Sequence, residues 1–111
     1  MEITIKKDSD ITIVYPSGRV DTLTAKNFEE GIMKIISDNK KIIISFSEIS
    51  YISSAGLRVI LVAGKKIASM KGQLALADMS EKIYEIFKMS GFDKILKIYP
   101  TYSEARSSFD K

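Results

Sequence analysis

Apolar residues recur along the chain with two different spacings. Where every second residue is apolar the pattern predicts a strand, and where every third or fourth residue is apolar it predicts an amphipathic helix. Five segments have the first pattern or a short continuous apolar run, which predicts strands at residues 3–6, 11–15, 42–46, 74–77 and 95–99. The third of these is almost continuously apolar and β-branched, which is typical of a central strand covered on both faces.

Helical spacing predicts four helices between these strands. Thr24, Ser80 and Thr101 are good N-caps, because a hydroxyl at that position accepts a hydrogen bond from a free helical N–H group. Leu23 and Phe28 occupy the two positions of a hydrophobic staple around the first cap. The expected helices lie between Thr24 and Ser37, between Ser54 and Gly72, between Ser80 and Gly91, and from Thr101 to Phe109.

The predicted order of elements is therefore ββαβαβαβα. Strands and helices that alternate through short connections favour an α/β fold with a mixed, mostly parallel β-sheet. The turn at residues 8–10 predicts that the first two strands pair antiparallel. Pro16 has no N–H donor, so the second strand should bend there or lie at an edge. The length of 111 residues fits one domain over residues 1–111.

Composition excludes several kinds of chemistry. The chain has no cysteine and no histidine. Disulfides, thiolate metal sites, the commonest metal ligand and the usual general base at neutral pH are therefore absent. No cluster of acids has the spacing of metal ligands, so we expect neither an intrinsic metal site nor a cofactor.

Charge and hydropathy limit the partners. The net charge is +3, but the lysines alternate with acids, which is typical of a solvated surface and argues against direct nucleic-acid binding. No window approaches the roughly 20 apolar residues of a membrane span. The N-terminal residues lack the basic and apolar regions of a signal peptide.

Two segments are candidates for function because each ends a predicted strand and precedes a predicted helix. They are residues 18–22, with the sequence GRVDT, and residues 53–56, with the sequence SSAG. In parallel sheets functional groups gather where the carboxyl ends of strands meet helix N-termini. If the two strands are neighbours, Asp21 and Ser54 lie at the same end of the sheet.

The paired hydroxyls of Ser53 and Ser54 allow several interpretations. A helix cap is the one that the local sequence favours. A catalytic nucleophile is disfavoured because no histidine can activate it, and the glycine spacing and lysine of a phosphate-binding P-loop are missing. The remaining interpretation is that a serine accepts a phosphoryl group from another protein. A phosphate at a helix N-terminus meets free N–H groups and the positive end of the helix dipole.

Asp21 and Arg58 also have two interpretations each. Asp21 can cap the following helix, or it can orient the Ser54 hydroxyl or bind a metal during phosphoryl transfer. Arg58 should point outward from the first turn of the second helix, either as a solvated cation or as a residue that contacts a partner.

Three stretches resemble the STAS family of anti-sigma factor antagonist domains. SEISYISSAGLRVIL resembles the family signature, hydrophobic-Asp-Ser-[Ser/Ala/Thr]-Gly-Leu at a strand-to-helix junction. GRVDTLTA resembles the family's Gly-x-hydrophobic-Asp segment, and LALADMSEKIYEIFKMSGFDKILKIYPTYSEA resembles its C-terminal half. The similarity covers essentially the whole chain in order, and it implies a single STAS-like domain.

The resemblance implies a cytoplasmic bacterial regulator of transcription and not an enzyme. Family members bind an anti-sigma factor, typically a serine kinase, and so release a sigma factor. The kinase phosphorylates the serine after the motif aspartate, which abolishes binding, and a metal-dependent serine phosphatase restores it. By position that serine is Ser54, with Asp21 as the nearby acid, while Ser53 replaces the motif aspartate and is a rival acceptor.

The sequence leaves more than one function open. As a phosphorylation-controlled module, the chain would bind its partner through Asp21, Thr22, Ser53, Ser54, Ala55, Gly56 and Arg58. The first alternative is a STAS scaffold that assembles with other proteins, or with a transporter, without phosphorylation. The second is a small enzyme that uses Ser54 with Asp21, which the lack of histidine and of convergent polar groups disfavours.

Overall fold

The computed structural model describes residues 2–110, which form six strands, four α-helices and one 3₁₀-helix. The strands are β1 (Glu2–Asp8), β2 (Ile11–Val20), β3 (Lys41–Ser45), β4 (Ile49–Ile52), β5 (Gln73–Ala77) and β6 (Ile98–Tyr99). The helices are α1 (Ala25–Asp38), α2 (Ser54–Ser69), α3 (Glu81–Met89) and α4 (Tyr102–Ser108), with the 3₁₀-helix η1 (Phe92–Lys94) after α3.

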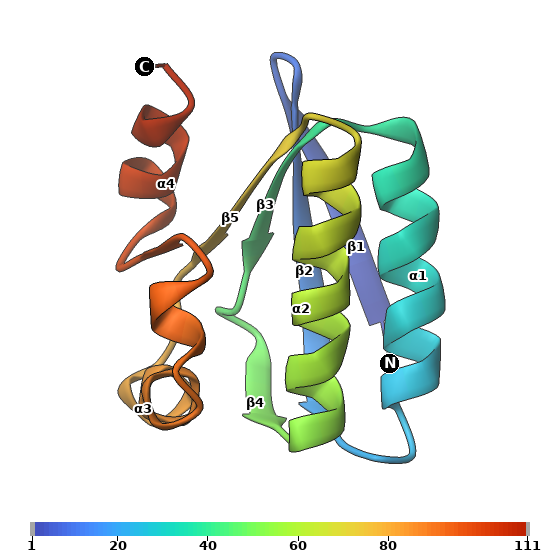
Figure 1. Cartoon of the computed structure of the whole chain (residues 1–111), viewed down its shortest axis with the longest axis vertical. Helices are drawn as coiled ribbons and strands as arrows, with labels where there is room; N and C mark the ends of the chain where they lie inside the picture. Colours follow the sequence, from blue (N-terminus) through green and yellow to red (C-terminus); the bar gives the residue numbers. More distant parts are fainter. Residues whose placement is uncertain (1, 111) are drawn as a thin grey trace.

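The strands form one mixed sheet in the order β1-β2-β3-β5-β6, and β4 pairs with the far end of β2. β1 and β2 are antiparallel, whereas the pairs β2–β3, β2–β4, β3–β5 and β5–β6 are parallel. The antiparallel first pair and the mostly parallel sheet are therefore confirmed. Figure 1 shows α1 and α2 side by side across the sheet, with α3 and α4 at its other end.

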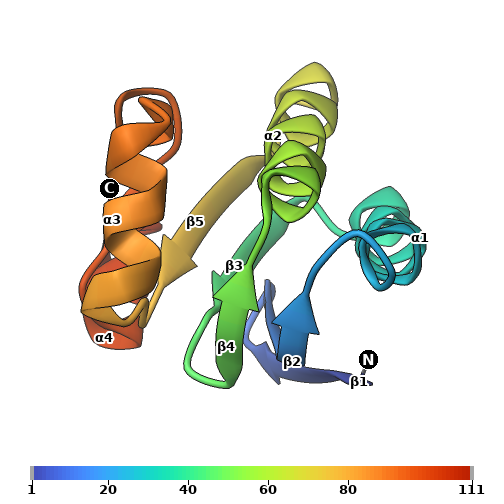
Figure 2. The same ribbon diagram turned by 90° about the horizontal axis from the view of Figure 1, so that it is seen from below.

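Apolar residues form a cluster on each face of the sheet. The larger cluster lies under α1, α2 and α3 and includes Phe28, Ile60 and Phe87. The smaller one lies under α4 and includes Ile43 and Phe109. Figure 2 shows α1 and α2 on one side of the sheet. Ile42 and Ile44 of β3 belong to one cluster and Ile43 to the other, and all three are buried, so the prediction of a central strand covered on both faces is confirmed.

β4 was not predicted, and its existence explains the position of Pro16. β2 pairs with β3 through Thr12–Val14 and with β4 through Gly18–Val20, so Pro16 lies between the two partners. A missing N–H there removes no ladder hydrogen bond to β3 or β4. β2 lies inside the sheet and not at its edge. The irregularity falls slightly later, as a register shift between Gly18, which has φ of +106°, and Arg19.

Two other expectations were wrong. Leu23 is 90% exposed, so it forms no staple with the buried Phe28. The last strand is limited to β6, because residues 95–97 form a turn after η1 and leave Ile95 65% exposed. Apolar residues in that segment were assigned to a strand, but Leu96 packs against the core from a helical turn.

The caps of the later helices are confirmed. The Ser80 hydroxyl accepts a hydrogen bond from the Ile83 N–H at 3.2 Å, and the Thr101 hydroxyl accepts one from the Glu104 N–H at 3.2 Å. Thr24 is the N-cap of α1 by position, but its side chain makes no capping hydrogen bond. The start of α1 is held instead by Asp21.

Candidate functional site

The two candidate segments lie side by side. Val20, the last residue of β2, pairs with Ile52, the last residue of β4, and the Ser53 N–H donates to the Val20 carbonyl at 2.8 Å. α1 and α2 consequently begin at the same end of the molecule, which is the lower end in Figure 1. The expectation that the segments containing Asp21 and Ser54 meet at one end of the sheet is confirmed.

The two serines have different environments. Ser53 is the N-cap of α2: it is half-buried, and its Oγ accepts a hydrogen bond from the Gly56 N–H at 3.3 Å. Ser54 is the first residue of the helix, and its side chain is exposed. The capping interpretation is thus confirmed for Ser53. Ser54 presents a hydroxyl to solvent at the positive end of a helix of 16 residues.

Gly56 allows α2 to approach the ends of both strands. A Cβ atom at this position would lie 2.7 Å from Cγ1 of Ile52 and 2.7 Å from Cγ1 of Val20. Both neighbours are β-branched and almost fully buried, so neither can move aside easily. Ala55, beside it, is half-buried and packs against the larger apolar cluster. These two small residues therefore allow the first turn of α2, which carries Ser54, to pack closely against the ends of β2 and β4.

Asp21 fixes the loop between β2 and α1. Its Oδ1 accepts hydrogen bonds from the Leu23 N–H at 3.0 Å and the Thr24 N–H at 3.1 Å. Partial burial opposes ionisation, but these hydrogen bonds and the Arg19 guanidinium lower the pKa of Asp21 below its ordinary value. The carboxylate is therefore ionised at neutral pH. The structure shows no hydrogen bond between Asp21 and Ser54, and the capping role is the one that it supports.

Three side chains that the sequence analysis did not assign to partner binding lie around this loop. The Arg19 guanidinium stacks over the Tyr51 ring at 4.5 Å from its centroid, and Arg19 Nε lies 3.7 Å from Asp21 Oδ2. Leu23 projects into solvent at the tip of the loop. Tyr51 was overlooked because β4 was not predicted, and Leu23 because its spacing from Phe28 indicated a staple.

The outer members of the predicted face are exposed. Thr22 follows Asp21 in the loop, and Arg58 lies on the first turns of α2 with its side chain in solvent, as expected. Together with Ser54 and Leu23 they form what we call the serine face, which consists of Arg19, Asp21, Thr22, Leu23, Tyr51, Ser53, Ser54 and Arg58.

The side chains of the serine face are suited to contact with another protein. Within residues 2–110, no group of three or more His, Cys, Asp or Glu side chains is placed to hold a metal ion. No helix among these residues is long and apolar enough to cross a membrane. The face combines an exposed hydroxyl, an exposed leucine, a stacked arginine and tyrosine, and one ionised carboxylate. Such a mixture suits protein recognition.

Comparison with known proteins connects this arrangement to one family. Residues 2–105 match the STAS domain. BtrV of Bordetella bronchiseptica, provisionally named an anti-sigma factor antagonist, is 28% identical over 98% of this chain and 95% of its own length. A crystal structure from Thermotoga maritima with the same provisional name is 28% identical, covers 98% of this chain and 95% of its own, and superposes with a TM-score of 0.92.

A third comparison concerns the fold alone. The Bacillus cell fate determinant SpoIIAA, solved in its phosphorylated form, superposes with a TM-score of 0.71 at 18% identity. The alignment covers 97% of this chain and 99% of the SpoIIAA chain.

Proposed function

Because the chain belongs to the STAS domain family, we propose that it is an anti-sigma factor antagonist whose partner binding is controlled by phosphorylation of Ser54. The partner would be an anti-sigma factor with serine kinase activity, and its capture in the cytoplasm would release a sigma factor. A metal-dependent serine phosphatase would restore the bound state. The chain itself acts as a regulator and not as an enzyme.

One observation carries this proposal: Ser53 caps α2, while Ser54 beside it is exposed. A kinase needs an accessible hydroxyl, and the capping hydroxyl of Ser53 is half-buried and already engaged. A phosphate on Ser54 would be favoured by the N-terminal end of α2. It would add about −1.5 to −2 charge units to the serine face without disturbing the core. We therefore assign Ser54, and not Ser53, as the acceptor.

Charge explains how this modification would control binding. Without the phosphate, the serine face offers Leu23 and the stacked pair Arg19 and Tyr51 to a partner. A phosphate group on the serine face would need to be desolvated against the partner or matched by its cations. A loss of about 3 kcal/mol would weaken binding by more than a hundredfold. No change of fold is needed for such a switch.

Phosphopeptide mapping tests the acceptor. The chain, Ser54→Ala and Ser53→Ala are incubated with a kinase recovered by pull-down from cells of the source organism. We expect phosphate on the unmodified chain and on Ser53→Ala, and none on Ser54→Ala. Phosphate retained on Ser54→Ala and lost from Ser53→Ala would assign the acceptor to Ser53 and contradict the proposal.

Binding to the same kinase tests the switch. Ser54→Asp adds a charge, and Ser54→Asn is its matched neutral control of nearly equal size. We expect Ser54→Asp to bind at least tenfold more weakly than Ser54→Asn, as measured by calorimetry. Leu23→Gln should also weaken binding, while the free energy of unfolding changes by less than about 0.5 kcal/mol. Equal affinity of the two Ser54 variants would refute control by charge.

The replacement of the motif aspartate favours one other function. Because Ser53 stands at that position, the serine face lacks the negative charge that the family motif places beside the acceptor. A STAS scaffold that binds its partner through the same face without phosphorylation would have this property. It would bind Ser54→Asp and Ser54→Asn equally and carry no phosphate after incubation with the kinase.

A further inference from the structure

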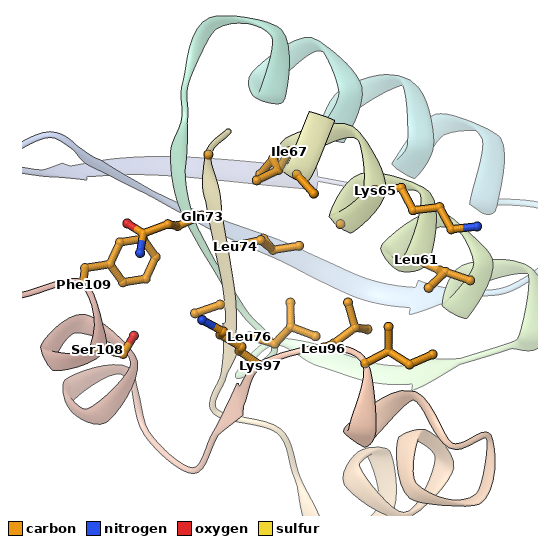
Figure 3. A pocket seen from close by; sticks show the side chains of 15 residues that line it. Leu61, Lys65, Ile67, Gln73, Leu74, Leu76, Leu96, Lys97, Ser108 and Phe109 are labelled. Carbon is orange, nitrogen blue, oxygen red and sulfur yellow. The ribbon is translucent and has the colours of Figure 1, made fainter. Parts of the chain in front are cut away.

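A second site lies on the other half of α2, away from the serine face. A cleft with a volume of about 330 Å³ opens between α2, β5, the segment after η1 and the end of α4. This volume falls within the range of small-molecule pockets, roughly 300–1,000 Å³. Figure 3 shows Gln73 and Ser108 at one end of the cleft, Leu61 and Lys65 at the other, and Leu74 and Leu96 between them.

The cleft exists because β6 is short. β5 pairs with β6 only at Leu76 and Ala77, so the outer edge of β5 from Gln73 to Ala75 carries no strand. Gln73 donates its N–H to Lys40 on the β3 side, and Leu76 donates to Lys97 on the β6 side. Peptide groups alternate in direction along a strand. The Leu74 peptide group therefore faces outward, into the cleft.

The walls are mainly apolar and come from both faces of the sheet. Leu61 and Gly64 of α2 lie over the edge of β5 on one side, and Phe109 after α4 lies on the other. Gly64 keeps the α2 wall open: a Cβ atom there would lie 3.1 Å from Cδ2 of Leu96. An apolar chain could occupy this space and remove leucine surface from water.

The charged groups at the cleft are all of one sign. Lys65 and Lys97 line it, and no acidic residue is among its described lining residues. Gln73 offers an amide, and the Leu74 N–H is an outward-facing backbone donor. The Ser108 hydroxyl is engaged, because it donates to the Ala105 carbonyl at 2.6 Å. The cleft thus combines an apolar floor with cationic and N–H donors, which complements an anion attached to an apolar chain.

We propose that this cleft binds a medium-chain alkyl carboxylate. Its alkyl chain lies against Leu61, Leu74 and Leu96, and its carboxylate accepts hydrogen bonds from Lys97 and the Gln73 amide. The exposed lysine stems cover part of the chain while their ammonium groups stay in water. The site uses the second half of α2 and needs neither Ser54 nor an anti-sigma factor, so it goes beyond the proposed function.

Titration with decanoate, followed by two-dimensional amide NMR and calorimetry, tests the proposal. We expect the largest shifts at the amides of Gln73, Leu74 and Leu96, with little change at Ser53 and Ser54. Decanol, which has the same chain without charge, should bind about two- to fivefold more weakly. Decyltrimethylammonium should bind more weakly still. Equal binding of all three ligands, or shifts confined to other residues, would overturn the proposal.

Variants locate the ligand. Ala68 is exposed and lines the cleft, whereas Ser69 is exposed beside it and does not line it. We expect Ala68→Phe to abolish decanoate binding and Ser69→Phe, the matched control, to leave it unchanged. Lys97→Gln should weaken decanoate about two- to fivefold and reduce its preference over decanol, and Lys65→Gln should weaken it less. A larger loss in Lys65→Gln, or unchanged binding in Ala68→Phe, would overturn the proposed placement.

Two comparisons separate this ligand from others. Decyl phosphate, like decanoate, carries an anionic head group on a ten-carbon chain. If it binds more tightly than decanoate, the natural head group is a phosphate and the proposed carboxylate is overturned. The outward Leu74 peptide group could also pair with an added strand of a partner. An extended apolar peptide that shifts the Leu74 amide where decanoate does not would overturn the proposal in favour of strand addition.

Discussion

Single residues determine how close the first turn of α2 lies to the sheet. Gly56 is required because no Cβ atom fits between Ile52 and Val20. The glycine in the signature thus has a packing role, and its φ is not in the left-handed region. The same helix start also shows the limit of local reasoning: the sequence predicted a serine cap, but only the structure shows that Ser53 is the cap and Ser54 the exposed neighbour.

Substitution of Gly56 tests this packing role. Gly56→Ala should lower the free energy of unfolding by about 1–3 kcal/mol, because the overpacked methyl group outweighs the better helix propensity of alanine. Gly31→Ala is the matched control. Its Cβ would lie 2.6 Å from the terminal Cδ1 of Ile3, a side-chain end on the edge strand that can rotate away. Urea denaturation of both variants measures the difference, and equal effects would contradict the explanation.

At the scale of elements, the prediction succeeded where a segment had a regular pattern and a clear cap. The centre of β3 is a run of three buried isoleucines, and α3 and α4 carry confirmed hydroxyl caps. It failed where partners decide the structure. β4 has only four residues and exposes the central two, so no alternation marks it, and it exists because β2 extends past Pro16. The apolar residues around Leu96 form a turn and not a strand. The contact of Leu96 with the larger apolar cluster overrides the β propensity of this segment.

The N-cap residue Ser53 contributes to the stability of α2 as a whole. Ser53→Ala should lower the free energy of unfolding by about 0.5–2 kcal/mol, because the Gly56 N–H loses its acceptor. Ser54→Ala should change it by less than about 0.5 kcal/mol, since that side chain is exposed. Thermal or urea denaturation distinguishes the two. A larger loss in Ser54→Ala would contradict the assignment of the cap.

At the scale of the whole molecule, one polar cluster joins the first strand to the last helix. The Tyr102 hydroxyl donates to Asp8, and Arg106 Nε lies 3.1 Å from Asp8 Oδ2. Hydrogen bonds from Tyr102 and Arg106 lower the pKa of Asp8. Burial and the hydrogen bond to Asp8 raise the pKa of Tyr102 to about 12. Sequence could not predict this cluster, because Asp8 is more than ninety positions away from both Tyr102 and Arg106.

The cluster makes stability depend on pH in the alkaline range. The pKa of tyrosine is about 10 in an unfolded chain. Since the pKa of Tyr102 is about 12 in the folded protein, its contribution is complete below pH ~10 and is lost as the pH rises through 12. Tyr102→Phe has no ionisable group there. The difference in free energy of unfolding between the two proteins should therefore shrink between pH ~10 and 12.

Urea denaturation across this range measures the difference, and comparison within the pair cancels the titration of other groups. Tyr99→Phe is the matched control, because it removes the hydroxyl of another tyrosine, the last residue of β6, which lies outside the Asp8 cluster. A difference that stays constant from neutral pH to pH 12 would contradict the role of Tyr102.

The position of α4 has a consequence for synthesis. α4 covers the second face of the sheet, and it is the last of the described elements to leave the ribosome. Until then Ile11, Ile13 and Ile43, which are buried in the finished fold, have no helix over them. A nascent chain that has made its whole sheet therefore still exposes an apolar strand surface, which is prone to aggregate. The rate of translation and chaperone access while α4 is being synthesised should thus affect the yield of this protein.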